Sequence, residues 1–236
     1  ARVKDRVPLI TQFLEQSYQA LISILQIILA LSPYGIFGLM AYTTGTLGLQ
    51  VLVPLAIYLF GIAIACLFQI FIVSGLLVWL VARVSPIQFF KHSWDYALVA
   101  FSTQSSAASL PVEFEAAKKM GVEPEISGFT LPLGSLNQDG TALYQAFATV
   151  LIAQFYGIDM SFGQQFLVLF TALLASSGSF AIPGAGLITL SIVLNSVGVP
   201  LEGIALVAGV DRIADAFRTA LNVVDDMACT VAVAAT

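Results

Sequence analysis

The chain has 236 residues, of which 58% are hydrophobic and only 10% are charged. A soluble domain carries about 25% charged residues, so this composition, with a mean hydropathy of +0.94, indicates a membrane protein. The net charge of −5 identifies no partner, because some of the acids lie in apolar segments. There is no basic cluster typical of nucleic-acid binding. No nucleotide-binding loop, metalloprotease motif or nucleophile elbow favours an enzyme. Cys66 and Cys229 lie alone in apolar segments, where packing is the expected role.

Two long apolar helices open the chain. Residues 16–82 contain no Asp, Glu, Lys or Arg, and a span of the hydrocarbon core takes about 20 apolar residues. The first helix, within residues 1–47, is expected to start near Pro8 and to bend near Pro33. After a turn rich in Gly and Thr, residues 48–82 form the second span.

Shorter helical segments with polar interruptions follow. Residues 87–120 contain a helix too short and polar to span, the breaker TQSSAASLP and a polar helix, a pattern that predicts a re-entrant hairpin. Within that polar helix, Glu113, Glu115, Lys118 and Lys119 are expected to form a solvated end. Residues 127–157 read as one span interrupted at GSLNQDGT. Residues 161–198 read as a second re-entrant hairpin with the tip SSGSFAIPGAG, and residues 202–234 as a charged last span.

The last span carries one polar face. At 100° per residue, six polar side chains fall within an arc of about 100°. A charged side chain at a helix centre costs roughly 2.5–3.5 kcal/mol, so this face must turn to a protein interior or to water. An ion-pair network that only holds helices together is one interpretation, and a site for a charged solute and cations is the favoured one. The six residues are Asp211, Asp215, Arg218, Thr219, Asn222 and Asp226.

The basic residues predict the orientation. Outside the last span they fall on one side of this topology, while the loops near 44–50, 157–163 and 197–203 contain none. The positive-inside rule then places loops 1–7, 83–91 and 118–126 in the cytoplasm, in a multi-pass protein of the cell membrane.

The two hairpin-plus-span units resemble each other. In each unit a serine pair precedes a proline in the tip, and a span with a carboxamide and a carboxylate follows. Because the hairpins enter from opposite faces, the units are inverted repeats, which are typical of secondary transporters. An ion channel or a structural membrane subunit is the other class considered. The matching residues are Ser105, Ser106, Pro111, Asn137 and Asp139, and then Ser176, Ser177, Pro183, Asn222 and Asp226.

Four motifs carry a family resemblance: SSAASLP, NQDGTALYQ, ASSGSFAIPGAG and DRIADAFRTALNVVDD. At these residues the chain resembles the dicarboxylate/amino acid:cation symporter family, the sodium- or proton-coupled glutamate and aspartate transporters. The resemblance implies an all-α membrane protein with the glutamate-transporter fold, an elevator mechanism and a homotrimer. Residues 1–47 would belong to the scaffold and residues 48–236 to the transport domain. The chain would be the C-terminal part of a transporter, from about the fifth span onward.

The resemblance also implies a substrate pocket. Arg218 would bind the side-chain carboxylate of an acidic amino acid, and Asp215 would receive its ammonium group. The chemistry agrees, since a guanidinium pairs with a carboxylate through two hydrogen bonds and a buried Asp needs a cation. Asp215 favours glutamate or aspartate over the alternative, a C4-dicarboxylate. The remaining implied contacts are Thr219, Asn222, Ser105, Ser106, Thr141, Ile182, Pro183 and Gly186.

Sodium is the implied coupling ion, without a covalent cofactor. One site would use Asp226, Asn222 and carbonyls near Gly134 and Asn137. A second would use carbonyls of Ser176, Ser177 and Ser179 with one near Ser135, and a third would use Asn137 and Asp139.

Three departures from the family pattern bear on coupling. Gln138 replaces a Met, the stretch from Gly134 to Asn137 is one residue shorter, and Gln104 stands where some relatives carry an Arg, whose role Arg212 could partly take over. Proton coupling therefore stays open, with Asp139 and Asp226 as carriers.

Overall fold

The computed structural model describes residues 8–179 and 184–236, and every regular element in these ranges is helical. The helices bury their small and apolar side chains against one another, as expected for this composition. In chain order they are α1 (Pro8–Leu47), η2 (Leu49–Val51), α2 (Leu52–Phe68), η3 (Gln69–Ser74), α3 (Gly75–Leu77), η4 (Val78–Ala82), α4 (Pro86–Thr103), α5 (Ser106–Lys119), α6 (Pro124–Gly134), α7 (Asp139–Phe155), α8 (Phe162–Ser177), α9 (Ala185–Val197), η5 (Leu201–Gly203), α10 (Ile204–Ala208) and α11 (Asp211–Ala234).

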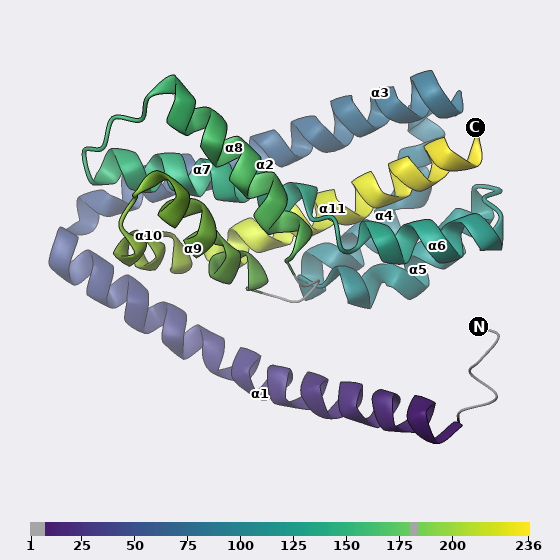
Figure 1. The fold of residues 1–236 in the computed structure, drawn as a ribbon, viewed down its shortest axis with the longest axis horizontal. Coiled ribbons are helices and arrows are strands. Elements are labelled where there is room, and N and C mark those ends of the chain that lie inside the picture. Colours follow the sequence, from purple (N-terminus) through teal and green to yellow (C-terminus); the bar gives the residue numbers. More distant parts are fainter. Residues whose placement is uncertain (1–7, 180–183) are drawn as a thin grey trace.

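The charged helix α11 is the central element of the molecule. It runs through the middle of the body in Figure 1 and contacts α2, α4, α5, α6 and α7. Two apolar clusters flank it. One joins α11 to α2, α7, α8 and α9, and the other joins it to α4, α5 and α6. The predicted polar face of this helix therefore lies in a protein interior, because the surrounding helices cover it.

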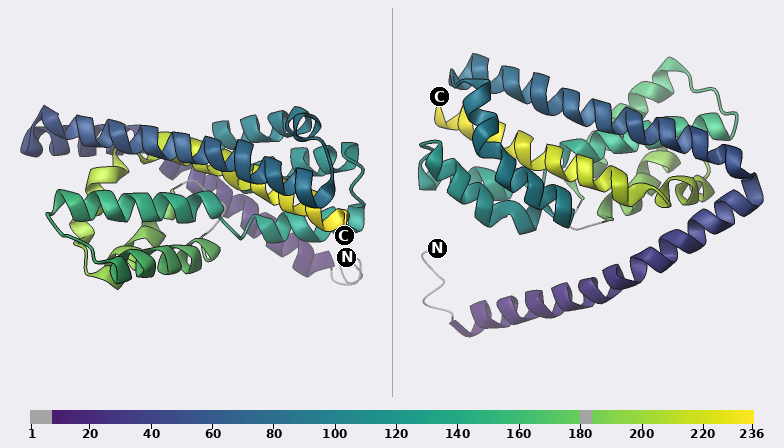
Figure 2. Two further views of the ribbon diagram at one scale, coloured as in Figure 1. Left: turned by 90° about the horizontal axis from the view of Figure 1, so that it is seen from above. Right: turned by 180° about the vertical axis from the view of Figure 1, so that it is seen from behind.

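The first helix, α1, stands apart from the other helices (Figures 1 and 2). Near its C-terminal end Met40 packs against Val51, Leu55 and Leu206. Toward the N-terminus of α1, apolar side chains such as Phe37, which is 76% exposed, are not covered by other described residues. The run Leu49–Ala82 is also mostly uncovered, and it is the helix in the described residues that is long and apolar enough to cross a membrane.

Two helical hairpins and a broken helix surround α11. Helix α4 packs against α5, and α8 packs against α9. The first tip is shorter than the predicted breaker TQSSAASLP and consists of Gln104 and Ser105. Gln104 turns the chain in a left-handed conformation (φ 54°), and Ser105 Oγ accepts a hydrogen bond from the Ala108 backbone N–H at 3.3 Å. This cap starts α5 at Ser106, so most of the serines belong to the helix.

Other boundaries also differ from the prediction. The broken span starts at Pro124 instead of residue 127, because proline suits the first turn of a helix. The predicted last span of residues 202–234 is interrupted, since α10 ends at Ala208 and α11 starts at Asp211. Between them Gly209 lies against the Met40 side chain of α1, where a larger residue would not fit.

The prediction that the end of α5 is solvated is wrong for one residue. Glu113 is 1% exposed and is buried in the body. Glu115, Lys118 and Lys119 are exposed, as predicted. The helical period explains the difference, because residues two positions apart lie on nearly opposite sides of a helix.

The connections between helices lie at two ends of the molecule. The η4–α4 and α5–α6 connections lie at the end where the chain terminates, and the α1–α2, α7–α8 and α9–α10 connections lie at the other (Figures 1 and 2). The two hairpins consequently point their tips toward the middle from opposite ends.

Candidate binding site on the last helix

The centre of the candidate site is Arg218, a guanidinium that is 1% exposed. Its Nε donates to Asp215 Oδ1 at 2.8 Å, and its Nη1 donates to Asp211 Oδ1 at 3.2 Å. The plane of the guanidinium lies over the Tyr144 ring, with Cζ 4.1 Å from the ring centroid. Arg218 is thus paired with two carboxylates on neighbouring turns of α11, which leaves one net negative charge, and an aromatic face from α7 supports the cation.

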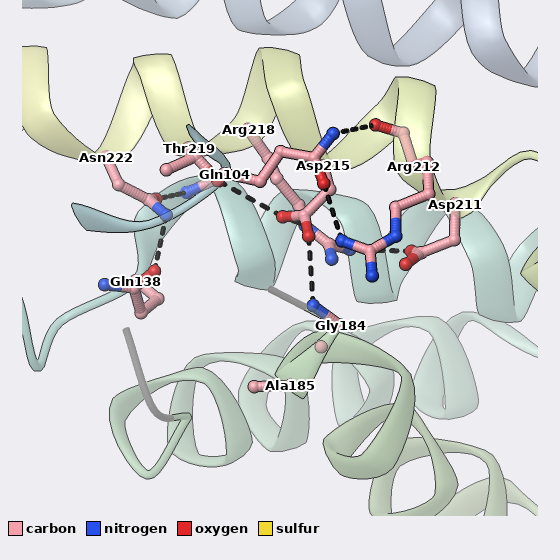
Figure 3. A network of polar contacts seen from close by, with 12 residues as sticks. Gln104, Gln138, Gly184, Ala185, Asp211, Arg212, Asp215, Arg218, Thr219 and Asn222 are labelled. Atoms are coloured by element: carbon pink, nitrogen blue, oxygen red, sulfur yellow. Dashed lines mark hydrogen bonds and ion pairs between the residues drawn. The ribbon is translucent and has the colours of Figure 1, made fainter. Parts of the chain in front are cut away.

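The tips of both hairpins dock on this stretch of α11 (Figure 3). From the second tip, the Gly184 backbone N–H donates to Asp215 Oδ2 at 3.1 Å. From the first tip, Gln104 Nε2 donates to the Arg212 carbonyl at 2.9 Å, while Arg212 Nη1 donates to Gln104 Oε1 at 2.7 Å. Arg212 therefore binds Gln104, the residue that stands where some relatives carry an arginine.

Glycine allows the second hairpin to approach. A Cβ on Gly186 would lie 2.9 Å from Arg218 Nη1, a separation that real Cβ atoms do not show. The position thus requires a residue without a side chain, and the start of α9 can lie directly on the guanidinium.

Between these elements lies a small polar cavity of about 10 Å³. A cavity of this size holds about one water molecule. Larger cavities of about 550 Å³ and 310 Å³ lie at apolar surfaces and contain no charged side chain, so they are no match for a charged solute. The polar cavity is lined by Gln104, Ser106, Gln138, Thr141, Ser179, Ala185, Gly186, Asp215, Arg218 and Thr219.

Asn222 fixes the break between α6 and α7. Its Nδ2 donates to Gln138 Oε1 at 2.6 Å, and its Oδ1 accepts from the Gly140 backbone N–H at 2.7 Å. Gln138 Nε2 in turn donates to the Ser135 carbonyl at 2.7 Å. Gln138, the residue that departs from the family pattern, is therefore buried and links the broken helix to α11 through hydrogen bonds.

Asp226 is the last carboxylate of the polar face along α11. It is 5% exposed, and its Oδ2 has no hydrogen-bond partner among the described residues. A Cβ on Gly134 would lie 2.6 Å from Asp226 Oδ1, so the end of α6 reaches this carboxylate only because the residue is glycine. A buried carboxylate in this state requires a cation or a proton.

The other predicted cation ligands lie around the break and the second tip. Asn137 Nδ2 donates to Asp139 Oδ1 at 2.9 Å near the surface. Ser176 and Ser179 are buried, and Ser177 is exposed. No group of three His, Cys, Asp or Glu residues in the described ranges could hold a metal ion. A cation here would depend on backbone carbonyls and single carboxylates, the oxygen ligands that suit a hard cation.

The structure gathers many of the predicted residues. Ser106, Thr141, Gly186, Asp215, Arg218 and Thr219 line one cavity, together with Ser179. Thr219 Oγ1 donates to Asp215 Oδ1 at 3.1 Å. Asn222 lies one turn after Arg218 on α11 and does not line the cavity. Ser105 caps α5 instead of lining the cavity. Ile182 and Pro183 lie outside the described residues.

Two contacts of the site were missing from the sequence prediction. Asp211 lies on the predicted polar face but had been given no role, and its pairing with Arg218 follows from a spacing of seven residues, two turns. Tyr144 was not considered, although it lies three residues after Thr141 and therefore on the same side of α7. That spacing was the available signal.

Comparison with known proteins places the chain among membrane transporters. Residues 1–236 match the model of the Sodium:dicarboxylate symporter family. The Proton/sodium-glutamate symport protein of Bacillus caldotenax is 36% identical over 228 residues, which are 95% of this chain and 53% of that protein. The Proton/glutamate-aspartate symporter of Escherichia coli (strain K12) is 37% identical over 227 residues, 93% of this chain and 50% of that protein. Excitatory amino acid transporter 1 of Rattus norvegicus is 36% identical over 232 residues, 95% of this chain and 42% of that protein. The chain thus spans about half the length of the curated relatives it matches.

Proposed function

The chain belongs to the sodium:dicarboxylate symporter family, and on this premise we propose that it carries the binding site of a cation-coupled symporter for glutamate or aspartate. The observation that supports this most directly is the buried Arg218, held between two aspartates where the tips of both hairpins meet. Its neighbourhood offers a charged partner for the side-chain carboxylate and for the ammonium group of an acidic amino acid.

The proposed substrate contacts follow from charge. The side-chain carboxylate of the substrate binds Arg218 and replaces one of its aspartate partners. The ammonium group binds Asp215, which would otherwise be left buried without a counter-charge. Thr219, Thr141 and Ser106 line the same cavity and supply hydroxyl groups. Asn222 would also bind the substrate, after giving up its hydrogen bond to Gln138 or to the Gly140 N–H.

Cations travel as co-substrates in this proposal. Asp226, Asn222 and the carbonyls near Gly134 and Asn137 form the first sodium site, which the unpartnered oxygen of Asp226 supports. A second site uses the carbonyls of Ser176, Ser177 and Ser179 with one near Ser135, and a third uses Asn137 and Asp139. The Gly134 carbonyl of the first site accepts a hydrogen bond from the Asn137 backbone N–H at 2.6 Å, and the Ser135 carbonyl of the second site accepts one from Gln138 at 2.7 Å. Proton coupling through Asp139 or Asp226 is the alternative, and the names of the relatives include both ions.

We also propose that the two hairpins are re-entrant gates in an inverted repeat and that transport uses an elevator movement. Their tips approach α11 from opposite ends, which supports two gates. The separation of α1 supports a scaffold at residues 1–47 that assembles into a homotrimer and a transport domain at residues 48–236. Loops 1–7, 83–91 and 118–126 would lie in the cytoplasm.

The decisive experiment measures uptake of labelled aspartate by the full-length transporter in liposomes, with sodium and proton gradients imposed separately. Uptake driven by an inward sodium gradient supports the proposal. Uptake driven only by a proton gradient selects the proton-coupled alternative. Succinate outcompeting aspartate would replace the amino acid by a C4-dicarboxylate, and the absence of gradient-driven uptake would contradict the proposed function.

A further inference from the structure

Glu113 is a buried carboxylate that the binding site described above does not use. It lies on α5, the second arm of the first hairpin, and is 1% exposed. Its Oε2 has no hydrogen-bond partner, and no described Lys, Arg or His forms an ion pair with it. Glu113 lies on the inner face of α5, as the helical spacing of the buried residues of this helix shows. These residues are Ser106, Ser109, Glu113, Ala116 and Ala117.

The hydrogen bonds around Ser109 indicate which protonation state fits this geometry. Ser109 Oγ lies 2.6 Å from Glu113 Oε1 and 2.8 Å from the Ser106 carbonyl oxygen. A hydroxyl group has one proton and donates only once, while a carbonyl can only accept. If Ser109 donates to Ser106, the contact with Glu113 requires a proton on the carboxyl group, which then donates to Ser109. Adding one proton to Glu113 therefore allows both contacts to be hydrogen bonds.

The charged group brought near Glu113 by α11 is another acid, Asp226. The apolar cluster between α4, α5, α6 and α11 surrounds it. From α4, the Tyr96 hydroxyl donates to Ser93 and so supplies no counter-charge. From α11, the Asp226 carboxyl group lies near enough for the charge of Glu113 to act on it. An ionised Glu113 would therefore be desolvated, with a second acid nearby and without a counter-charge among the described residues.

We propose that Glu113 is a proton-binding site built into the first hairpin, with its carboxyl group donating to Ser109 and Ser109 donating to the Ser106 carbonyl. This short chain of hydrogen bonds ends in the first turn of α5, where Ser106 lines the polar cavity. The proton site depends only on the packing of α5, whereas its consequence for coupling rests on the proposed function.

That consequence is a linkage between protons and the cation at Asp226. Ionisation of Glu113 adds negative charge near Asp226 and strengthens cation binding there. By reciprocity, a cation at Asp226 favours release of the proton from Glu113. Sodium binding is then accompanied by proton release.

The test of the proton site uses the full-length protein in lipid nanodiscs and infrared spectroscopy. At neutral pH the wild type should show the C=O band of a buried protonated carboxyl group. Glu113→Gln should lose it, and the matched control Glu115→Gln, at an exposed position of the same helix, should keep it. Ser109→Ala should keep the band but shift it, because the hydrogen bond is lost. A band that is unchanged in Glu113→Gln, or absent in the wild type, would overturn the proposal.

Thermal unfolding in the same nanodiscs gives a second readout. The folded protein holds a proton on Glu113 that the unfolded chain releases, so wild-type stability should fall as the pH rises from about 5 to about 8. Glu113→Gln, which can donate to Ser109 as the protonated acid does, should fall less over that range. Equal pH dependence in both proteins would count against the site.

A third measurement separates this inference from the proposed function. Sodium is added to weakly buffered protein containing a pH-sensitive dye, while thermal stability reports sodium binding independently. Stabilisation with proton release in the wild type but not in Glu113→Gln supports the linkage. Equal proton release in both proteins overturns it. If sodium neither stabilises the protein nor tightens aspartate binding, the proposed function fails, while the infrared band still decides the proton site.

Discussion

Arg218 shows how a single residue can be both structural and functional. Its hydrogen bonds to Asp211 and Asp215 pair the guanidinium with two carboxylates and leave one net negative charge in the closed cavity. In the proposed site, a substrate carboxylate exchanges with an aspartate, and the released aspartate binds the substrate ammonium group. The proposed exchange requires both charges on the ligand and would select amino acids over simple anions.

The first prediction concerns this guanidinium. Arg218→Lys should lower aspartate affinity at least tenfold, because a lysine keeps the charge but loses the bidentate geometry. A hydrogen bond to a charged group contributes about 1.5–3 kcal/mol, and about 1.4 kcal/mol is tenfold in affinity. Titration calorimetry measures the change, with Lys119→Ala, an exposed cation of α5, as the control. Unaltered affinity in Arg218→Lys would remove the residue from the substrate site.

The second prediction concerns substrate class. Asp215→Ser should weaken aspartate binding and leave succinate binding equal or stronger, because the ammonium partner is deleted while Arg218 remains. The ratio of the affinities for aspartate and succinate is measured in the wild type by competition against labelled aspartate. In the variant it is measured by direct titration. A wild type that already prefers succinate would show that Asp215 has another role.

The third prediction concerns Asp226. Sodium should raise the thermal unfolding midpoint of the wild type and tighten aspartate binding. Asp226→Asn should lose most of both effects, because the amide lacks the charge that binds the cation. Asp159→Asn, on the exposed α7–α8 connection, is the control. If aspartate affinity in the wild type is indifferent to sodium at fixed ionic strength and follows pH, the proton-coupled alternative holds.

Among the helices, close approach depends on glycines that face α11. A Cβ on Gly140 would lie 2.5 Å from the Arg218 carbonyl oxygen, so the start of α7 touches the backbone of α11. The same contact brings the Gly140 N–H to Asn222. Helix packing and the binding site therefore depend on the same residue.

The fourth prediction tests this contact. Gly140→Ala should destabilise the protein by about 1–3 kcal/mol, as expected for overpacking, and should weaken substrate binding as α7 shifts. Gly128→Ala is the matched control, since it lies within α6 with nothing within 4 Å of its Cβ position. Thermal unfolding in detergent compares the two variants. Equal midpoints for Gly140→Ala and Gly128→Ala would contradict the contact.

The sequence predicted the elements more accurately than their ends. Apolar runs and breakers placed both hairpins and the break near Asn137, because these signals are local. The interruption before Asp211 was missed, since Gly209 lies there to accommodate Met40 from a distant helix. The pairing of Asn222 with Gln138 could not be derived from either helix alone. Local patterns determine which face of a helix is polar, and tertiary packing determines what meets that face.

The whole molecule has two ends, and the predicted topology assigns one of them to the cytoplasm. The α5–α6 and α7–α8 connections lie at opposite ends (Figure 2). Lys118 and Asp159 are exposed beside these connections. A reagent that cannot cross the bilayer will therefore distinguish them.

The fifth prediction uses this separation. In a variant without Cys66 and Cys229, Asp159→Cys should react with a membrane-impermeant thiol reagent added to intact cells. Lys118→Cys should react only after permeabilisation, because the basic end is the cytoplasmic one. Mass-shift gel analysis records the labelling. The opposite pattern would invert the orientation, and labelling of both positions in intact cells would contradict a membrane-embedded body.

In the proposed transport cycle, the polar face of α11 would set the number of ions that accompany a solute. Within Asp211–Asp226, the aspartates 211, 215 and 226 outnumber Arg212 and Arg218 by one charge, and an acidic amino acid adds one more negative charge. Crossing a low-dielectric barrier with two uncompensated charges is prohibitive. Electroneutrality then requires at least two monovalent cations per substrate, before Asp225 is counted. With two such cations the loaded pocket is neutral, so the step that carries it across the bilayer should be insensitive to membrane voltage.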